Sequence, residues 1–174
     1  MWLFLASEIM FFTGLIGAYI VLRSSHPNWP GPEGHLSVLL GTVNTLVLIC
    51  SSTTIVLALA ASEQGEMTSV RRWLLVTVAL GATFLFIKLG IEYAGKFSHH
   101  IFPNTNIFWS CYYTLTGFHA LHVLGGIIFN LFVLAQTRDP QRWKVQQGRL
   151  ELAGLYWHFV DIVWIFLFPL LYLL

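Results

Sequence analysis

The chain has 174 residues, of which 56% are hydrophobic, 16% aromatic and 10% charged, and its mean hydropathy is +0.71. Since soluble domains carry roughly 25% charged residues, this composition predicts an integral membrane protein and excludes an ordinary soluble enzyme. The net charge of +1, with no basic stripe in the sequence, argues against a nucleic-acid partner.

Five apolar runs are long enough to cross a bilayer, which takes about 20 residues in a helix. Short polar or proline-rich segments separate the runs, which cover residues 1–22, 36–61, 70–93, 107–135 and 150–174. We therefore predict an all-α membrane protein, a single domain of five transmembrane helices over residues 1–174. The first run has neither a basic segment before it nor a small-residue cleavage motif, so we expect a mature helix and not a signal peptide.

Lysine and arginine are unevenly distributed between the predicted loops. The first and third loops hold Arg23 and Lys96, whereas the second and fourth hold Arg71, Arg72, Arg138, Arg142, Lys144 and Arg149. Because cytoplasmic loops carry the excess of positive charge, we predict a cytoplasmic N-terminus and an external C-terminus.

Glu8 lies roughly 10 Å along the first predicted helix, at about 1.5 Å per residue. Three interpretations stay open. The residue is a carboxyl that exchanges protons or contacts a partner protein, a protonated glutamate hydrogen-bonded inside the bundle, or an interfacial side chain where the membrane edge lies further along the helix.

The second predicted helix carries four consecutive hydroxyl side chains at residues 51–54. We favour hydrogen bonds from these hydroxyls back to carbonyls one turn earlier in the same helix. Cys50 in this helix and Cys111 in the fourth fall at different membrane depths, so we expect two buried free thiols and no disulfide.

Lys88 and Glu92 are spaced i and i+4 near the external end of the third predicted helix. This spacing predicts an ion pair whose side chains extend together toward the membrane surface. His99 and His100 follow in the third loop, where we expect them to face solvent.

His119 and His122 lie at mid-membrane depth in the motif TGFHALHVLGG of the fourth predicted helix. Neutral imidazoles there could be metal ligands, haem ligands, proton relays or hydrogen-bonding core residues. The specific haem hypothesis pairs His122 with His158 on a facing helix. A closed zinc or copper site is disfavoured, since the chain has no cysteine or carboxylate cluster to complete four ligands.

The fifth predicted helix contains the run WHFVDIVWIFLF, which places His158 and Asp161 three residues apart. A carboxylate near the bilayer centre is costly, so Asp161 should face protein or water and have a partner. His158 shares its helix face and is the nearest candidate. The sequence contains no nucleophile elbow, phosphate-binding glycine loop or HExxH motif, so we expect no catalytic centre in this chain.

Taken together, the motifs resemble those of subunit III of the haem-copper respiratory oxidases, in the family's order and over essentially the whole chain. WHFVDIVWIFLF and TGFHALHVLGG are close to the family's most recognisable stretches. The other matching stretches are SEIMFF at residues 7–12, VNTLVLICSS at residues 43–52 and the pair Glu92 and Tyr93.

This resemblance implies a non-redox, multi-pass subunit of a terminal oxidase in the bacterial inner membrane. It implies that haem and copper belong to partner subunits and that this chain stabilises subunit I, binds phospholipid and sustains proton uptake on the cytoplasmic side. Glu8 matches the family's membrane glutamate, with proton uptake or subunit I contact as its implied role. Structural hydrogen bonds or lipid contacts are expected of the remaining buried polar residues, which are Lys88, Glu92, His119, His122, His158 and Asp161.

One departure is that the common seven-helix form has two helices ahead of the glutamate-bearing helix with which this chain opens. The family's lipid cleft lies between those two helices and the rest, so it is not an expectation for this chain. Two other functions stay open at this point: an accessory protein of nitric oxide reductase from the same family, and a haem-binding membrane cytochrome. The electron donor, cytochrome c or a quinol, is a property of other subunits.

Overall fold

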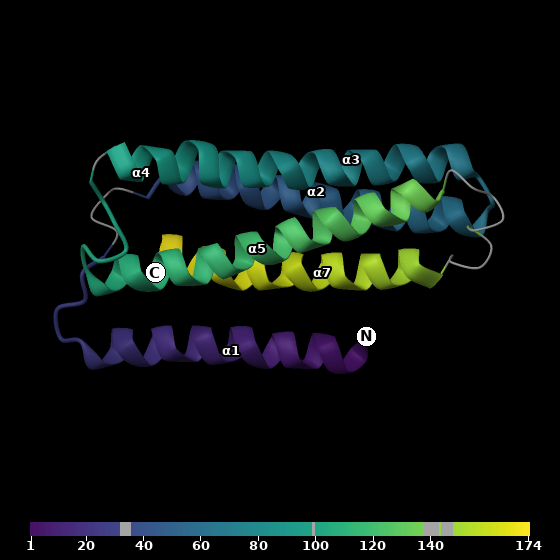
Figure 1. Cartoon of the computed structure of the whole chain (residues 1–174). Coiled ribbons are helices and arrows are strands. Elements are labelled where there is room, and N and C mark those ends of the chain that lie inside the picture. Colours follow the sequence, from purple (N-terminus) through teal and green to yellow (C-terminus); the bar gives the residue numbers. More distant parts are fainter. Residues whose placement is uncertain (32–35, 99, 138–142, 144–147) are drawn as a thin grey trace.

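The computed structural model describes residues 1–31, 36–98, 100–137, 143 and 148–174, and every regular element in these ranges is a helix. Figure 1 shows the helices lying side by side in one elongated bundle. In chain order the elements are α1 (Trp2–Ser25), α2 (Val38–Glu63), α3 (Met67–Leu85), η1 (Phe86–Tyr93), α4 (Ala94–Ser98), α5 (Ile107–Gln136), α7 (Gly148–Phe168) and η2 (Pro169–Leu173).

Five helices in the described ranges are long and apolar enough to cross a membrane, which confirms the predicted fold class. They span Trp2–Ser25, Val38–Glu63, Met67–Ser98, Ile107–Gln136 and Gly148–Leu173. We call the end where α1 and α7 begin the N-terminal end of the bundle, and the end where α1 and η2 finish the C-terminal end (Figure 1). The cytoplasmic and external assignment of these ends stays a prediction. Arg138, Arg142, Lys144 and His99, on which parts of the sequence analysis rest, lie outside the described residues.

The third membrane-spanning helix is longer than residues 70–93, because its middle widens without ending. The backbone changes from α to π geometry over η1 and returns to α geometry in α4, so the helix continues to Ser98. Lys96, expected in a loop, therefore lies inside a helix and is only 4% exposed. The last helix also widens, at Pro169, which has no N–H to donate to the helical ladder.

Local side-chain chemistry sets several helix ends. The Ser37 hydroxyl accepts a hydrogen bond from the Leu40 amide at 3.3 Å, and the Asn106 side chain accepts one from the Trp109 amide at 2.9 Å. Between α2 and α3 the chain reverses in three residues around Gly65, whose φ of 76° suits glycine. This tight turn makes α2 and α3 an antiparallel hairpin.

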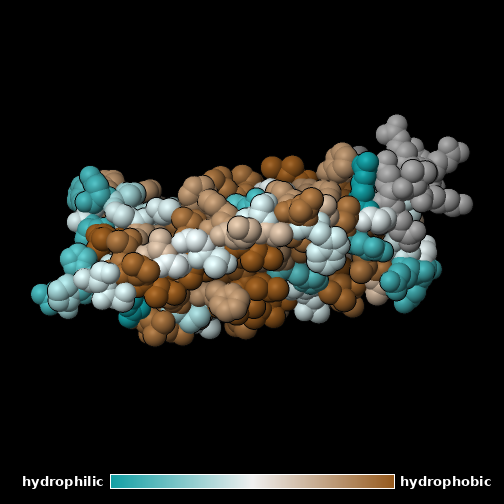
Figure 2. All heavy atoms as spheres, turned by 90° about the horizontal axis from the view of Figure 1, so that it is seen from below, coloured by the Kyte–Doolittle hydropathy of each residue, from teal (hydrophilic) through white to brown (hydrophobic). Residues whose placement is uncertain are grey.

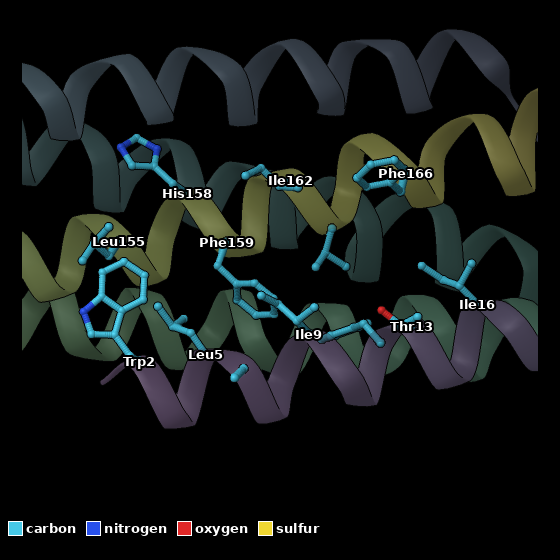
Figure 3. Close-up of a pocket in the computed structure, with 13 residues that line it drawn as sticks. Trp2, Leu5, Ile9, Thr13, Ile16, Leu155, His158, Phe159, Ile162 and Phe166 are labelled. Atoms are coloured by element: carbon cyan, nitrogen blue, oxygen red, sulfur yellow. The ribbon is translucent and has the colours of Figure 1, made fainter.

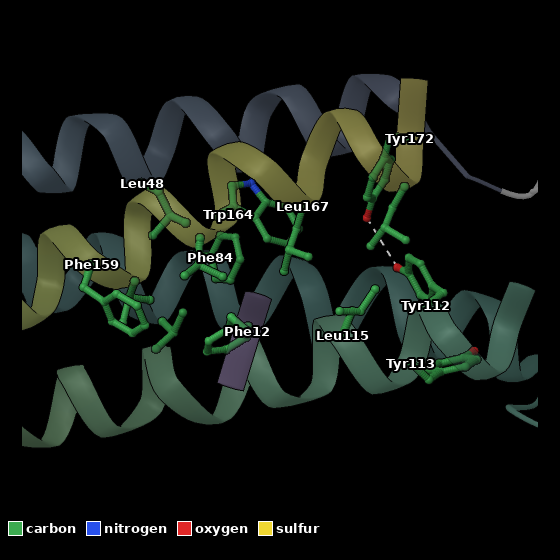
Figure 4. Packing of buried hydrophobic residues seen from close by; sticks show 14 of the residues in the cluster. Phe12, Leu48, Phe84, Tyr112, Tyr113, Leu115, Phe159, Trp164, Leu167 and Tyr172 are labelled. Carbon is green, nitrogen blue, oxygen red and sulfur yellow. Dashed lines mark hydrogen bonds between the residues drawn. The ribbon is translucent and has the colours of Figure 1, made fainter. Parts of the chain in front are cut away.

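The densest packing surrounds Trp157, which is 0% exposed. Its indole lies against Gly81 of α3 and Gly126 of α5, where an added Cβ would come within 2.6 Å and 2.8 Å of ring atoms. The indole N–H donates to the Ser51 hydroxyl of α2 at 2.9 Å. Trp157 of α7 thus joins three other helices, and aromatic rings extend the core toward the C-terminal end (Figure 4).

Helix α1 lies at the edge of the bundle and packs against α5 and α7 (Figure 1). Much of its apolar surface is uncovered, with Trp2 76% and Leu3 89% exposed. Figure 2, which views the bundle from the α1 side, shows a broad hydrophobic band with hydrophilic residues concentrated near both ends. This distribution suits a helix bundle whose outer surface faces lipid or partner helices.

Both cysteines are free, as expected, but they are less buried than predicted. Cys50 is exposed, and Cys111 is partly covered at the edge of the hydrophobic core, against which it packs. His100 is exposed, in agreement with its predicted loop position.

Candidate functional site

The polar residues singled out from the sequence gather in three places inside the bundle. The first is a pair between α1 and α5, in which Glu8 Oε2 and His122 Nε2 are 2.8 Å apart. The other ring nitrogen of His122 bonds to the Phe118 carbonyl at 2.7 Å. Their side chains are 21% and 17% exposed, so the rest of the chain shields most of the pair.

The hydrogen bonds of this pair bear on the haem hypothesis for His122 and on the three interpretations of Glu8. With both ring nitrogens hydrogen-bonded, the arrangement offers neither to an iron, and the proposed partner His158 bonds elsewhere. The pairing also favours the interpretation of Glu8 as a carboxyl bonded inside the bundle. Phe12 packs edge-on against the His122 ring, with ring centroids 4.9 Å apart, and Phe11 stacks on its other side at 6.4 Å.

The second place lies between α2 and α7, where Ser52 Oγ and His158 Nδ1 are 2.6 Å apart. The expected hydrogen bond between His158 and Asp161 is absent from the structure. Asp161 is 4% exposed, and neither carboxyl oxygen has a hydrogen-bond partner among the described residues. The Ser52 hydroxyl, which bonds to His158, also acts electrostatically on the Asp161 carboxyl, without forming a hydrogen bond to it.

Ser52 also departs from the expectation for residues 51–54. The hydroxyls of Ser51, Thr53 and Thr54 bond to carbonyls three or four residues earlier, at 2.7, 3.2 and 2.8 Å, as predicted. Ser52 instead bonds across the helix interface to His158. Its position on the face of α2 that meets α7 explains the difference, because a partner on another helix is within reach.

The third place, near the C-terminal end, is a group that we call the lysine–glutamate cluster: Lys88, Glu92, Lys96, Tyr112 and Tyr172. Lys88 Nζ lies 3.0 Å from Glu92 Oε2, and Lys96 Nζ lies 2.8 Å from Glu92 Oε1. The predicted Lys88–Glu92 pair is confirmed, but it does not extend to the membrane surface, since Lys88 is 1% exposed. The π geometry of η1 and η2 turns these side chains inward around Tyr112 of α5.

His119 is fully buried between the second and third places and makes no hydrogen bond to the described residues. Its ring stacks on Trp164, with centroids 5.1 Å apart, and meets Phe84 edge-on at 5.6 Å. The residue therefore acts in the structure as an aromatic packing element. No cluster of three or more potential metal-ligating residues occurs within the described ranges.

A groove of about 480 Å³ separates α1 from α7 beside these polar sites. Figure 3 shows Trp2, Leu5 and Ile9 of α1 on the same side of α7 as Phe159, whereas His158 and Ile162 lie on the other side of α7 in this view. The lining is almost entirely apolar, which suits a hydrocarbon chain better than a polar metabolite.

The sequence did not predict the Glu8–His122 pair, nor that Lys96 and two tyrosines join Lys88 and Glu92 in the lysine–glutamate cluster. The spacing i and i+4 between Glu92 and Lys96 could have identified Lys96, had the helix not been predicted to end at residue 93. Glu8 and His122 are 114 residues apart, and no local pattern joins them.

Comparison with known proteins gives a consistent result. The family model for cytochrome c oxidase subunit III matches residues 1–174. Cytochrome c oxidase subunit 3 of Thermostichus vulcanus is 40% identical over 177 residues, covering 98% of this chain and 84% of that protein. The Synechocystis protein of the same name is 43% identical over 175 residues, covering 99% and 73%. The probable cytochrome c oxidase subunit 3 of Mycobacterium tuberculosis is 40% identical over 171 residues, covering 97% and 83%.

Proposed function

Because the chain belongs to the cytochrome c oxidase subunit III family, we propose that it is a non-redox accessory subunit of a proton-pumping terminal oxidase in aerobic respiration. It is a multi-pass membrane protein, and we place it in the bacterial inner membrane. In this proposal haem and copper belong to partner subunits. The chain itself stabilises subunit I, binds phospholipid and supports proton uptake at the N-terminal end of the bundle.

The bonding of the intramembrane histidines supports a role without a cofactor in this chain. His122 is bonded at both ring nitrogens, His158 is bonded to Ser52 and His119 is enclosed by aromatic rings. This argues against the membrane cytochrome hypothesis, which needs facing histidine nitrogens directed at one iron. The names of the relatives favour an oxidase over nitric oxide reductase as the host complex.

The groove between α1 and α7 supports the lipid-binding part of the proposal. Its length follows two membrane helices, and its apolar lining complements an acyl chain lying parallel to them. Ile162, 53% exposed, lines the groove, whereas Ile165, 47% exposed, lies on the same helix outside it. Ile162→Trp should lower the phospholipid retained after purification, measured by mass spectrometry, and Ile165→Trp should not. Equal retention in both variants would argue against lipid in this groove.

The proposed role in proton uptake rests on the 2.8 Å contact between Glu8 and His122. A carboxyl and an imidazole that share a hydrogen bond can pass a proton between them, and a proton that the pair gains from or loses to its surroundings changes the local charge. Glu8 does not have to lie on the proton path into subunit I for this effect, since the electric field of a nearby charge alters the supply of protons.

The test is turnover of the assembled oxidase as a function of pH in Glu8→Gln and Glu8→Ala variants. The amide keeps the size and hydrogen bonding of the carboxyl but loses its charge, so Glu8→Gln should leave assembly intact and reduce turnover at alkaline pH. Glu63→Gln, at an exposed position on α2, is the matched control. A Glu8→Gln enzyme equal to wild type at every pH would remove Glu8 from proton supply and leave it a packing role.

A further inference from the structure

The lysine–glutamate cluster has hydrogen bonds that account for nearly every donor it contains. Lys88 Nζ donates to Glu92 Oε2 at 3.0 Å, to the Tyr112 hydroxyl at 2.8 Å and to the Tyr172 hydroxyl at 2.5 Å. Lys96 Nζ donates to Glu92 Oε1 at 2.8 Å and to Tyr112 at 2.9 Å. The two tyrosine hydroxyls donate in turn to Glu92 Oε1, at 2.6 and 2.5 Å. One carboxylate therefore serves four donors.

The charges of this cluster do not balance when both lysines are ammonium ions. Two positive charges then face the single carboxylate of Glu92, and the side chains are between 1% and 6% exposed. The other titratable groups around it are Tyr93, whose ring lies 5.9 Å from Lys88 Nζ, and Tyr113 and His119 of α5. None of the three supplies a negative charge at neutral pH.

An unbalanced charge in the membrane interior is costly, and the smallest change that removes it is the loss of one proton. The loss of that proton costs the network one hydrogen bond and keeps Lys88 bonded. The Tyr172 hydroxyl lies 2.5 Å from both Lys88 Nζ and Glu92 Oε1, so it can donate its proton to a neutral Lys88 amine in place of the carboxylate. Lys88 is the deeper lysine, since it stands two turns further than Lys96 from the end of the helix at Ser98.

We propose that the lysine–glutamate cluster is a proton-binding site at the C-terminal end of the bundle, in which Lys88 is a neutral amine that reversibly takes up one proton. With Lys88 neutral, the negative charge of Glu92 is balanced by Lys96 alone. The site is separate from the Glu8–His122 pair, and its existence does not depend on the role of Glu8.

Tyr112 provides the connection between the two lysines, because its hydroxyl lies 2.8 Å from Lys88 Nζ and 2.9 Å from Lys96 Nζ. When Lys96 passes a proton to water, it becomes an amine. Lys88, as an ammonium ion, then gives a proton to the Tyr112 oxygen while Tyr112 gives its own to Lys96 Nζ. The step leaves Lys88 neutral, Tyr112 unchanged and Lys96 charged. Figure 4 shows the Tyr112 and Tyr172 hydroxyls facing one another at this point, 3.3 Å apart.

The experiment is nitrogen-15 NMR of lysine-labelled protein in lipid bilayers, which distinguishes an amine from an ammonium nitrogen by chemical shift. The chain has three lysines, Lys88, Lys96 and Lys144. The double variant K96R/K144R keeps every charge and leaves Lys88 as the single labelled lysine. At about pH 8, where an ordinary lysine is an ammonium ion, Lys88 should give an amine signal that converts to ammonium as the pH is lowered.

Lys96→Met supplies the discriminating variant, because it removes the second positive charge. In the chain that carries it, Lys88 and Glu92 form a balanced pair, and the Lys88 signal should be ammonium at about pH 8. In Tyr112→Phe, Lys88 should still give the amine signal, but its exchange of protons with water should be slower. This variant therefore tests the proton transfer through Tyr112 independently of proton binding by Lys88. An ammonium signal for Lys88 in K96R/K144R at about pH 8, or no change of the amine signal in Lys96→Met, would overturn the proposal.

Discussion

The contact between Trp157 and Gly126 allows a sharp prediction about stability. An alanine Cβ at Gly126 would lie 2.8 Å from Trp157 Cε3 and 2.9 Å from Cζ3, and the indole cannot withdraw because it is fully buried and bonded to Ser51. Overpacking of this kind costs about 1–3 kcal/mol. Alanine also gains roughly 1 kcal/mol of helix propensity over glycine, so Gly126→Ala should destabilise the fold by up to about 2 kcal/mol.

Gly117, on the same helix, is the matched control. No atom lies within 4 Å of a Cβ added there, so Gly117→Ala should show only the propensity gain of up to roughly 1 kcal/mol. The propensity gain is common to both variants, so their free energies of unfolding should differ by the overpacking cost of about 1–3 kcal/mol, measured by denaturation in mixed detergent micelles and followed by circular dichroism.

A second substitution tests whether Trp157 is the cause. Trp157→Phe removes the part of the ring that meets the new methyl group. It should therefore lower the free energy of unfolding less in the Gly126→Ala variant than in the wild-type chain. Equal stability of Gly126→Ala and Gly117→Ala, or full additivity of the double variant, would refute the packing argument.

Three further predictions concern the polar groups and the topology. Ser52→Ala should destabilise the protein by about 1–3 kcal/mol, since it removes the bond to His158 and leaves a polar atom unpaired; an unfolding free energy equal to that of wild type would contradict this. The purified chain should show no haem absorption band near 400 nm, whereas a stoichiometric band that disappears in His122→Ala would restore the cytochrome hypothesis. Cysteines placed at the exposed positions Gln64 and Leu174, with the native cysteines removed, should label from opposite sides of sealed membranes, and labelling from one side would show an even number of spans.

The sequence predicts the five spans well because each is a long apolar run, and such runs are read directly from composition. It fails where the outcome depends on helix geometry or on distant partners. The end of the third span was placed too early because charged and small residues from Ala94 onward read as a loop, while the π segment turns Lys96 inward. The Lys88–Glu92 pair and the backbone bonds of Ser51, Thr53 and Thr54, all local in sequence, were correctly predicted.

The contacts of His122 and His158 illustrate the second limit. Periodicity places each residue on a helix face, but it does not say which helix lies opposite that face. The sequence identifies both histidines as polar residues within apolar helices, but it does not identify their hydrogen-bond partners. Their partners, Glu8 and Ser52, became identifiable when the packing order of the helices was known.

The way α1 is attached has a consequence for synthesis of the chain. The polar partners of α1 come from late in the sequence: His122 for Glu8, the Leu170 carbonyl for Tyr19 and the Leu174 oxygen for Arg23. The α2–α3 hairpin, by contrast, can close as soon as its short turn has left the ribosome. During translation Glu8 therefore enters the membrane long before its imidazole partner exists. Helix α1 therefore stays hydrated or bound to the insertion machinery until α5 and α7 have been inserted into the membrane beside it.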